Sequence, residues 1–313
     1  MAACVYTDER CLLHDPGPFH PEQPERLRAI WTAVEDLTKG GVTMRREGRE
    51  ATSRELGLGH DPVYLRRLEE ACQCAMPFLD TPDCPLSPRT FDAARVAAGT
   101  VIAACEDVAT GRTKRAFCAV RPPGHHAMHD RAMGFCYLCN LALGVRRARE
   151  LGVDRVAIVD FDVHHGNGTQ RAFYEDPQVL YISLHGDPRY VYPGTGYAEE
   201  RGSGPGRGTT LNIPLPLGSG DAEYRAAFAG QVVPTLDRFG AQLLAISAGF
   251  DAHREDLLVR QIGVGDETFD WMTDQLVAWA DAHAAGRVVS VLEGGYSTDV
   301  LTRCVRSHVE RMR

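Results

Sequence analysis

The residues best suited to chemistry follow an apolar run near the middle of the chain. Val156–Val159 is followed by Asp160, Asp162 and His164, and then by a Gly-x-Gly turn that contains Asn167. An uninterrupted apolar run predicts a strand buried on both faces. Because side chains alternate along a strand, we expect Asp160, Asp162 and His164 to share one face. Such donors at a strand end predict a site for Zn²⁺ or a similar divalent ion, whereas a salt-bridged turn would need a Lys or Arg there.

Three further apolar runs also end in side chains that could take part in catalysis. The runs cover residues 116–120, 243–246 and 288–292, and the side chains behind them are His125 with His126, Asp251, and Tyr296. Ligands bind at the carboxyl ends of parallel strands, so we expect these groups to meet beside the acids described above. The sequence therefore predicts a single site built from four strand ends.

Helical patterns separate the apolar runs and indicate the architecture. Residues 91–108 and 140–151 carry apolar side chains at helical spacing. An alternation of strand and helix is typical of a parallel sheet covered by helices on both faces. The Pro-rich stretch 80–88 predicts a loop, and the Gly-rich stretch 202–208 is too short to separate two domains. We therefore expect one α/β domain over residues 1–313.

The composition restricts the classes of function. Hydrophobic residues make up 44% of the chain, which is enough for a full core and argues against disorder. The net charge of −8 argues against a nucleic-acid partner and is compatible with cationic substrates. The cysteines lack zinc-knuckle spacing, and we expect Cys136 and Cys139 to be buried thiols in a helical stretch. Neither a signal peptide nor a membrane span is visible, so we expect a cytoplasmic protein without a membrane partner.

Six motifs together resemble one family, the zinc-dependent histone deacetylase superfamily, which includes acetylpolyamine amidohydrolases and acetoin-utilisation proteins. They are RPPGHH at 121–126, GFCYL at 134–138, DFDVHHGNGTQ at 160–170, YPGTG at 192–196, SAGFDAH at 247–253 and EGGYS at 293–297. Asn167 and the ending of SAGFDAH are more similar to the class II and bacterial branch than to class I. The resemblance implies an arginase/deacetylase-like domain with a central, parallel, eight-stranded sheet.

The resemblance also implies roles for the strand-end residues. It implies zinc ligands at Asp162, His164 and Asp251, a general base and acid at His125 and His126, orienting partners for them at Asp160 and Asn167, and an oxyanion donor at Tyr296. Fe²⁺ is an alternative to Zn²⁺ at a site with three protein ligands. Because Asn167 is uncharged, we expect His126 to stay neutral more readily and to act as the base.

Residues of a substrate channel follow from the same resemblance. Gly134, Phe135 and Tyr192 match the walls around an acyl-lysine stem, although isolated aromatic residues are more often part of a core. Asp83 matches a residue that holds the backbone amides of the substrate, with an Asx turn as the alternative interpretation. Leu258 matches a gatekeeper that is neutral in enzymes acting on peptides and glutamate in those acting on polyamines.

Two potassium sites and an internal arginine are implied as well. The first potassium site comprises Asp160, Ser183 and Leu184, with carbonyls of Asp162 and His164, and the second comprises Phe173, Asp176, Val179 and Thr209. The segment HPEQPERL at 20–27 resembles the family's arginine-bearing helix start. There Arg26 either lies near an internal product channel or pairs with Glu22 at the surface.

These features predict a zinc-dependent hydrolase that removes acetyl or longer acyl groups from lysine side chains of peptides or proteins. An acetylpolyamine or other small-amide amidohydrolase is the alternative within enzymes, and the run His185–Pro188 resembles that group. A non-catalytic module that binds acyl-lysine is the alternative outside enzymes. Every position with an expected catalytic role is filled, which favours an enzyme.

Overall fold

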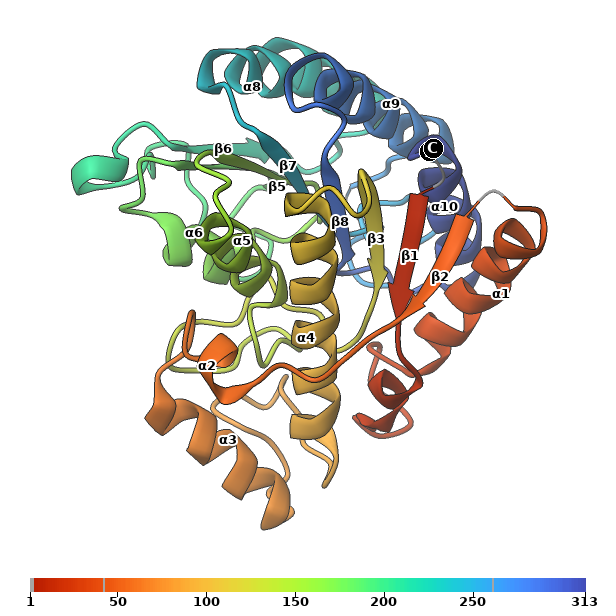
Figure 1. The fold of residues 1–313 in the computed structure, drawn as a ribbon, viewed down its shortest axis with the longest axis vertical. Helices are drawn as coiled ribbons and strands as arrows, with labels where there is room; N and C mark the ends of the chain where they lie inside the picture. Colours follow the sequence, from red (N-terminus) through yellow and green to blue (C-terminus); the bar gives the residue numbers. More distant parts are fainter. Residues whose placement is uncertain (1–2, 42, 261) are drawn as a thin grey trace.

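The computed structural model describes residues 3–41, 43–260 and 262–313, and its strands form one parallel sheet (Figure 1). The strands are β1 (Ala3–Thr7), β2 (Thr43–Glu47), β3 (Arg115–Ala119), β4 (Val156–Asp160), β5 (Val179–Gly186), β6 (Thr210–Leu215), β7 (Leu243–Ala248) and β8 (Val288–Leu292). The α-helices are α1 (Glu25–Lys39), α2 (Ser53–Leu56), α3 (Pro62–Gln73), α4 (Thr90–Ala109), α5 (Asn140–Glu150), α6 (Asn167–Phe173), α7 (Asp221–Ala227), α8 (Val233–Phe239), α9 (Asp266–His283) and α10 (Thr298–Arg311). Short 3₁₀ segments lie at Glu9–Leu13 and Gly204–Gly206, and a π-helical turn at Phe228–Val232 joins α7 to α8.

The strand order is β2-β1-β3-β8-β7-β4-β5-β6, so the three strands β8, β7 and β4 are neighbours in the middle of the sheet. Figure 1 shows helices α1, α8, α9 and α10 along one face, with α4, α5 and α6 along the other. This arrangement confirms the prediction of an eight-stranded parallel sheet covered on both faces.

The buried strands owe their place to their apolar sequences. Every residue of β3, β4, β5, β7 and β8 is buried, because helices cover both faces of the central sheet. The edge strand β2 instead has the mixed sequence TMRRE and exposes most of its side chains. The apolar runs of the sequence therefore identify central strands and miss this edge.

The structure contains the predicted loop, and a local sequence signal marks the start of one helix. Asp61 caps α3 by accepting a hydrogen bond from the Val63 N–H, with Pro62 in the first turn. Residues 80–88 form a loop. One local prediction was wrong: Cys136 and Cys139 are buried, but they lie in the loop before α5 and not in a helix.

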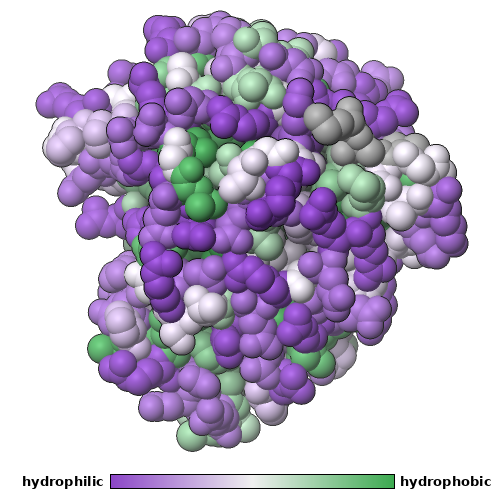
Figure 2. Space-filling view, viewed as in Figure 1, coloured by the Kyte–Doolittle hydropathy of each residue, from purple (hydrophilic) through white to green (hydrophobic). Residues whose placement is uncertain are grey.

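The surface agrees with a chain that buries its apolar residues. The face seen in Figure 2 is mostly hydrophilic, with small hydrophobic spots that are separated from one another. Among the described residues, no helix combines the length and the hydropathy needed to cross a bilayer.

Candidate functional site

Asp162, His164 and Asp251 converge where β4 and β7 end. Each offers one ligand atom, and the three atoms lie within 4.8 Å of one another. His164 Nδ1 is 3.1 Å from Asp162 Oδ1 and 3.0 Å from Asp251 Oδ2. Strand β4 ends at Asp160, so the predicted alternation beyond it was wrong, and a turn over residues 161–164 brings the side chains together instead.

Backbone groups approach the two carboxylates closely. The Gly294 N–H donates to Asp162 Oδ2 (2.7 Å), and the Val163 N–H donates to Asp251 Oδ1 (3.0 Å). A Cβ at position 294 would lie 2.5 Å from Asp162 Oδ2, so only glycine allows this approach. The chain after β8 thus forms one wall of the site.

The electrostatics of these residues favour a cation. Asp162 and Asp251 are fully buried, and no Lys or Arg pairs with either of them among the described residues. Burial alone would raise the pKa of Asp162, but the adjacent His125 and His164 hold it below its usual value. Burial and the charge of Asp162 raise the pKa of Asp251 to about 6. Two buried carboxylates and one imidazole form a donor set that fits a divalent ion such as Zn²⁺.

Two adjacent histidines, His125 and His126, lie beside this cluster on the loop after β3, with their rings tilted by 46° to each other. Their ring centroids are 4.0 Å apart, and both rings are buried. His125 Nδ1 lies 3.1 Å from Asp160 Oδ2, whereas His126 Nδ1 lies 2.8 Å from Asn167 Oδ1. Each histidine therefore has the partner implied by the sequence, one anionic and one neutral.

The two histidines consequently differ in proton affinity. Burial alone would lower the pKa of His125, but the carboxylates of Asp162 and Asp160 raise it to about 10. Burial and the adjacent His125 place the pKa of His126 well below its usual value. A cation bound to Asp162 would weaken the effect of this carboxylate on the pKa of His125. Asp160 would still raise that pKa. His126 is thus the neutral ring and His125 the one that favours a proton.

His164 of this cluster lines a narrow cavity of about 260 Å³. Its lining contains the five residues expected to contact the substrate, together with one metal-type ligand, one histidine of the pair and the tyrosine: Asp83, Gly134, Phe135, Tyr192, Leu258, His164, His126 and Tyr296. The ring of Tyr192 lies edge-on to His126, with centroids 5.1 Å apart. Phe135 lies edge-on to Tyr296 at 5.9 Å. The cavity is therefore walled by aromatic rings, as an aliphatic stem requires.

Two rim residues are fixed by local contacts. Asp83 Oδ2 accepts a hydrogen bond from the Gly134 N–H (3.0 Å) and holds the wall loop. Gly134 has φ +53°, a conformation that favours glycine, and a Cβ there would lie 2.9 Å from Tyr192 Cε1. Leu258, with 41% of its surface exposed, lies at the mouth.

Tyr296 presents its hydroxyl from the segment after β8. The residue is 8% exposed, and burial raises the pKa of its phenol well above the usual value, so the group remains a proton donor. The Arg26 guanidinium lies 4.9 Å from the centre of the Tyr296 ring. Arg26 pairs with Glu22 (2.9 Å), but both are buried, so the alternative of a surface pair was wrong.

The residues expected at the two potassium sites also lie together. Asp160 and Ser183 are register partners in β4 and β5, and Leu184 follows directly. Asp160 Oδ2 also accepts a hydrogen bond from the Tyr181 hydroxyl (3.0 Å). The second set surrounds the turn between α6 and β5, where the Thr209 hydroxyl donates to the Asp176 carbonyl (3.3 Å), and comprises Phe173, Asp176, Val179 and Thr209.

Glu293 contributes to the site although the sequence analysis gave it no role. Its Oε2 accepts hydrogen bonds from the N–H groups of Gly124 (2.7 Å) and His125 (3.1 Å) and so fixes the histidine loop. Its position directly after β8 was a usable signal, because the other strand ends carry site residues. Burial raises the pKa of Glu293 to about 7, against the opposing effect of His125.

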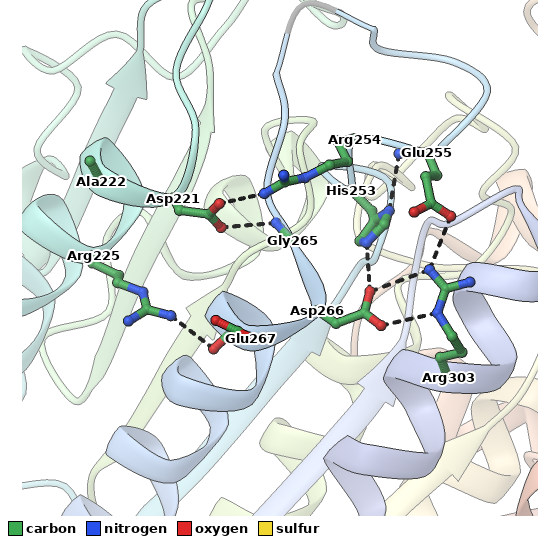
Figure 3. Close-up of a pocket in the computed structure, with 10 residues that line it drawn as sticks. All are labelled: Asp221, Ala222, Arg225, His253, Arg254, Glu255, Gly265, Asp266, Glu267 and Arg303. Carbon is green, nitrogen blue, oxygen red and sulfur yellow. Dashed lines mark hydrogen bonds and ion pairs between the residues drawn. The ribbon is translucent and has the colours of Figure 1, made fainter.

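A wider cavity of about 870 Å³ lies between α7, α9 and α10 (Figure 3). Its charged side chains pair with one another across the opening. Arg254 pairs with Asp221, and Arg303 pairs with Asp266 (3.0 Å) and Glu255 (3.1 Å). These internal pairs indicate a structural role for the cavity and leave few charges for a ligand.

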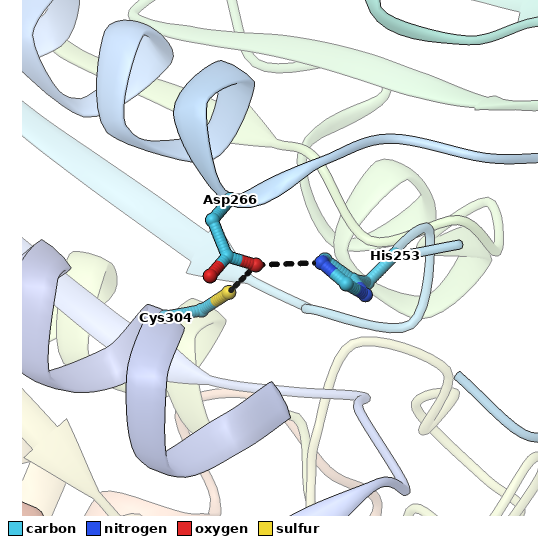
Figure 4. Close-up of side chains that lie close together, drawn as sticks. All are labelled: His253, Asp266 and Cys304. Carbon is cyan, nitrogen blue, oxygen red and sulfur yellow. Dashed lines mark hydrogen bonds and ion pairs between the residues drawn. The ribbon is translucent and has the colours of Figure 1, made fainter. Parts of the chain in front are cut away.

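His253, Asp266 and Cys304 also lie within reach of a common ion (Figure 4), but their contacts disfavour a metal. The Glu255 N–H donates to His253 Nδ1 (3.0 Å), so the neutral ring carries its proton on Nε2 and donates it to Asp266 (2.7 Å). Arg303 already supplies a cation to Asp266, and burial raises the pKa of the Cys304 thiol. We interpret the cluster as a hydrogen-bonded clamp on the loop behind Asp251.

Comparisons with known proteins agree with this site and fold. The model of the histone deacetylase domain matches residues 20–312, so the chain belongs to the histone deacetylase domain family, a family of hydrolases. A histone deacetylase-like amidohydrolase of Pseudomonas aeruginosa is 37% identical over 98% of this chain and 85% of that protein. A probable deacetylase of Archaeoglobus fulgidus is 39% identical over 96% of this chain and 82% of that protein. The crystal structure of the HDA15 HD domain superposes with a TM-score of 0.89 at 36% identity and covers 99% of this chain and 90% of that one.

Proposed function

We propose that the protein is a zinc-dependent deacylase that removes acetyl groups from lysine side chains of peptides or proteins. The observation that carries this proposal is the composition of the narrow cavity. It has aromatic walls, a neutral residue at its mouth, and a metal-type ligand, a neutral histidine and a tyrosine at its inner end. Such a cavity fits an uncharged acyl amide on an aliphatic stem.

The ligands proposed for zinc are Asp162, His164 and Asp251, and Fe²⁺ would suit the same donors. When bound by these residues, the ion would supply Lewis-acid chemistry, which polarises an acyl carbonyl and lowers the pKa of a water molecule. Asp160 with Ser183 and Leu184, and the set around Asp176, are proposed to hold potassium ions that fix the surrounding backbone.

The protein side chains supply orientation and proton transfer. Phe135 and Tyr192 hold the aliphatic stem, so that the amide reaches the inner end of the cavity. His126 is neutral and donates its Nδ1–H to the Asn167 amide oxygen, so its Nε2 is the atom that accepts a proton from the attacking water. His125 favours the protonated form and donates to the leaving amine. Tyr296 donates its phenolic hydrogen to the oxygen on which negative charge develops.

The mouth of the cavity favours lysine over a polyamine. Leu258 offers no anionic partner to a second ammonium group. Asp187 in the run that resembles amidohydrolases pairs with Arg189, so its charge is already neutralised. Asp83 supports the alternative, because it is the carboxylate among the cavity-lining residues and could attract an amine. Its hydrogen bond to the Gly134 N–H supports the structural role instead.

A side-by-side turnover assay tests this proposal. The purified protein would be given an acetyl-lysine peptide, a long-chain acyl-lysine peptide and an acetylpolyamine, before and after treatment with a chelator. We expect preference for the acetylated peptide, loss of turnover with the chelator, and recovery on adding Zn²⁺. Preference for the polyamine would identify the alternative substrate class, and binding of the peptide without turnover would identify a non-catalytic module.

A further inference from the structure

Asp256 contacts two segments that line the narrow cavity. Its Oδ2 accepts hydrogen bonds from the backbone N–H groups of Tyr296 (2.6 Å) and Ser297 (3.0 Å). Its Oδ1 accepts one from the backbone N–H of Leu258 (3.3 Å). One carboxylate therefore joins the segment of the proposed oxyanion donor to the mouth residue.

The Asp256 carboxylate is buried and depends on these amides. The residue is 4% exposed, and no ion pair of the described residues includes it. The nearby Arg303 pairs with the neighbouring Glu255 instead. A carboxylate removed from water is stable only where it is hydrogen-bonded or paired. Ser297 is the N-cap of the 14-residue helix α10, whose dipole also favours an anion at this end. The backbone at Tyr296 and the carboxylate of Asp256 therefore fix each other's position.

The loop that carries Asp256 is closed at its base. The Asp256 N–H donates to the His253 carbonyl (2.9 Å), and Arg254 and Ala252 exchange backbone hydrogen bonds with Val264 at 2.9 Å. The clamp in Figure 4 adds the contact of His253 with Asp266. Because the base is held in this way, the Asp256 carboxylate contacts the Tyr296 segment from a loop that is fixed at both sides of its base.

We propose that Asp256 is a positioning residue that places the Tyr296 hydroxyl over the acyl carbonyl and couples this placement to the cavity mouth at Leu258. The proposal rests on the proposed function, because it assigns Tyr296 a part in the reaction. A misplacement of about 1 Å at a reacting group can lower a rate about 10²-fold. Loss of the Asp256 contacts should therefore act on turnover through Tyr296.

A double-mutant cycle with Asp256→Asn and Tyr296→Phe tests this coupling, with kcat measured on an acetyl-lysine peptide. In asparagine an NH₂ group replaces one of the two carboxylate oxygens. This group is a donor, so the side chain can no longer accept all three backbone hydrogen bonds. We expect Asp256→Asn to lower kcat about 10- to 100-fold in the wild-type background. In Tyr296→Phe protein it should lower kcat less than about twofold, because the group that it positions is absent.

The matched control is Asp299→Asn, which makes the same change of charge in the exposed first turn of α10 and should leave kcat within about twofold of wild type. An unchanged kcat in Asp256→Asn would overturn the proposal. The proposal would also be overturned if the fold-decreases in kcat of the two single variants multiplied in the double variant. A general structural defect would lower kcat by the same factor whether or not the Tyr296 hydroxyl is present. If Asp256→Asn does not fold, Asp256→Glu replaces it in the cycle, since it keeps the charge and displaces the carboxylate by one methylene.

Hydrogen exchange separates this proposal from the proposed function. If the wild-type protein turns over no acetylated amine, the proposed function fails, and the contacts are tested without any substrate. We expect the amides of residues 296–297 to exchange faster in Asp256→Asn than in wild type and at the wild-type rate in Asp299→Asn. Equal exchange in all three proteins would show that Asp256 does not hold this segment.

Discussion

The Nδ1 atom of His126 faces a neutral partner, the amide oxygen of Asn167, at 2.8 Å. The adjacent His125 faces the carboxylate of Asp160. This difference allows the two rings to hold different protonation states in one buried site, which a base and an acid acting on the same substrate require.

Replacing Asn167 by Asp should therefore move the pH dependence of turnover. A carboxylate stabilises the imidazolium and raises the pKa of His126, so the base becomes protonated at a higher pH. The acidic limb of the kcat/KM profile should move upward by about one pH unit or more. The control Gln178→Glu adds the same charge on an exposed residue and should leave the limb in place. A limb that stays or moves to lower pH would exclude His126 as the base.

Removing the Tyr296 hydroxyl should abolish most turnover without loss of metal. Loss of one oxyanion donor typically lowers kcat about 10²- to 10³-fold. We expect this loss for Tyr296→Phe on an acetyl-lysine peptide, with metal content measured in the same samples. Tyr192→Phe is the matched control, because it removes a hydroxyl from another tyrosine that lines the same cavity and should keep most activity. Equal effects of the two substitutions would contradict the oxyanion role.

A negative charge at the mouth should shift substrate preference. Leu258→Glu would place a carboxylate where a second ammonium of a polyamine could bind, and exposed ion pairs contribute up to about 1 kcal/mol. The ratio of kcat/KM for acetylpolyamine over acetyl-lysine peptide should therefore rise at most about fivefold. Leu257→Glu makes the same change on the adjacent residue, which is 55% exposed and does not line the cavity. A rise in both variants would point to a general charge effect instead of a gatekeeper.

Acid should destabilise the protein in part through His308, which packs between α9 and β8. Thr273 donates its hydroxyl hydrogen to the Phe269 carbonyl and accepts from His308 Nδ1 (2.7 Å), so Nε2 accepts from the Ser290 hydroxyl (2.9 Å). The ring is thus neutral, and burial lowers its pKa from 6.5 to about 4.

The sign of the effect follows from that lowered pKa. Between pH 6.5 and pH 4 the unfolded chain takes up a proton at this histidine and the folded chain does not, so stability falls as the pH falls. The loss reaches ~3 kcal/mol in the free energy of unfolding at the lower limit. Urea titrations at several pH values should show this part of the pH dependence in wild type and not in His308→Gln. His129 is exposed, so the control variant His129→Gln should behave like wild type.

The central fold and the site could be predicted because both depend on strand ends. Apolar runs identified β3, β4, β7 and β8, and the residues after them meet since parallel strands end at one edge of the sheet. The edge strand β2 could not be found in this way, because most of its side chains face solvent and its sequence is not apolar. The motifs also identified the residues that line the narrow cavity.

Other features were not predictable because they depend on backbone contacts between distant segments. Asp256 accepts hydrogen bonds from backbone amides that lie up to 41 residues away in the sequence. Every residue except proline has such an amide, so the pattern of side chains does not indicate which amides it contacts. The burial of Arg26 with Glu22 depends on carbonyls at Glu293 and Gly295, which the helix start alone cannot indicate. The turn at residues 161–164 replaced a regular strand for the same reason.

The strand order has a consequence for how the chain is made. β8 is the last strand in the sequence, yet it lies between β3 and β7 in the middle of the sheet. Until the ribosome has released the segment up to residue 292, β2-β1-β3 and β7-β4-β5-β6 have no strand to join them, and two apolar edges stay open. The two parts of the sheet can therefore join only after the β8 segment has been made.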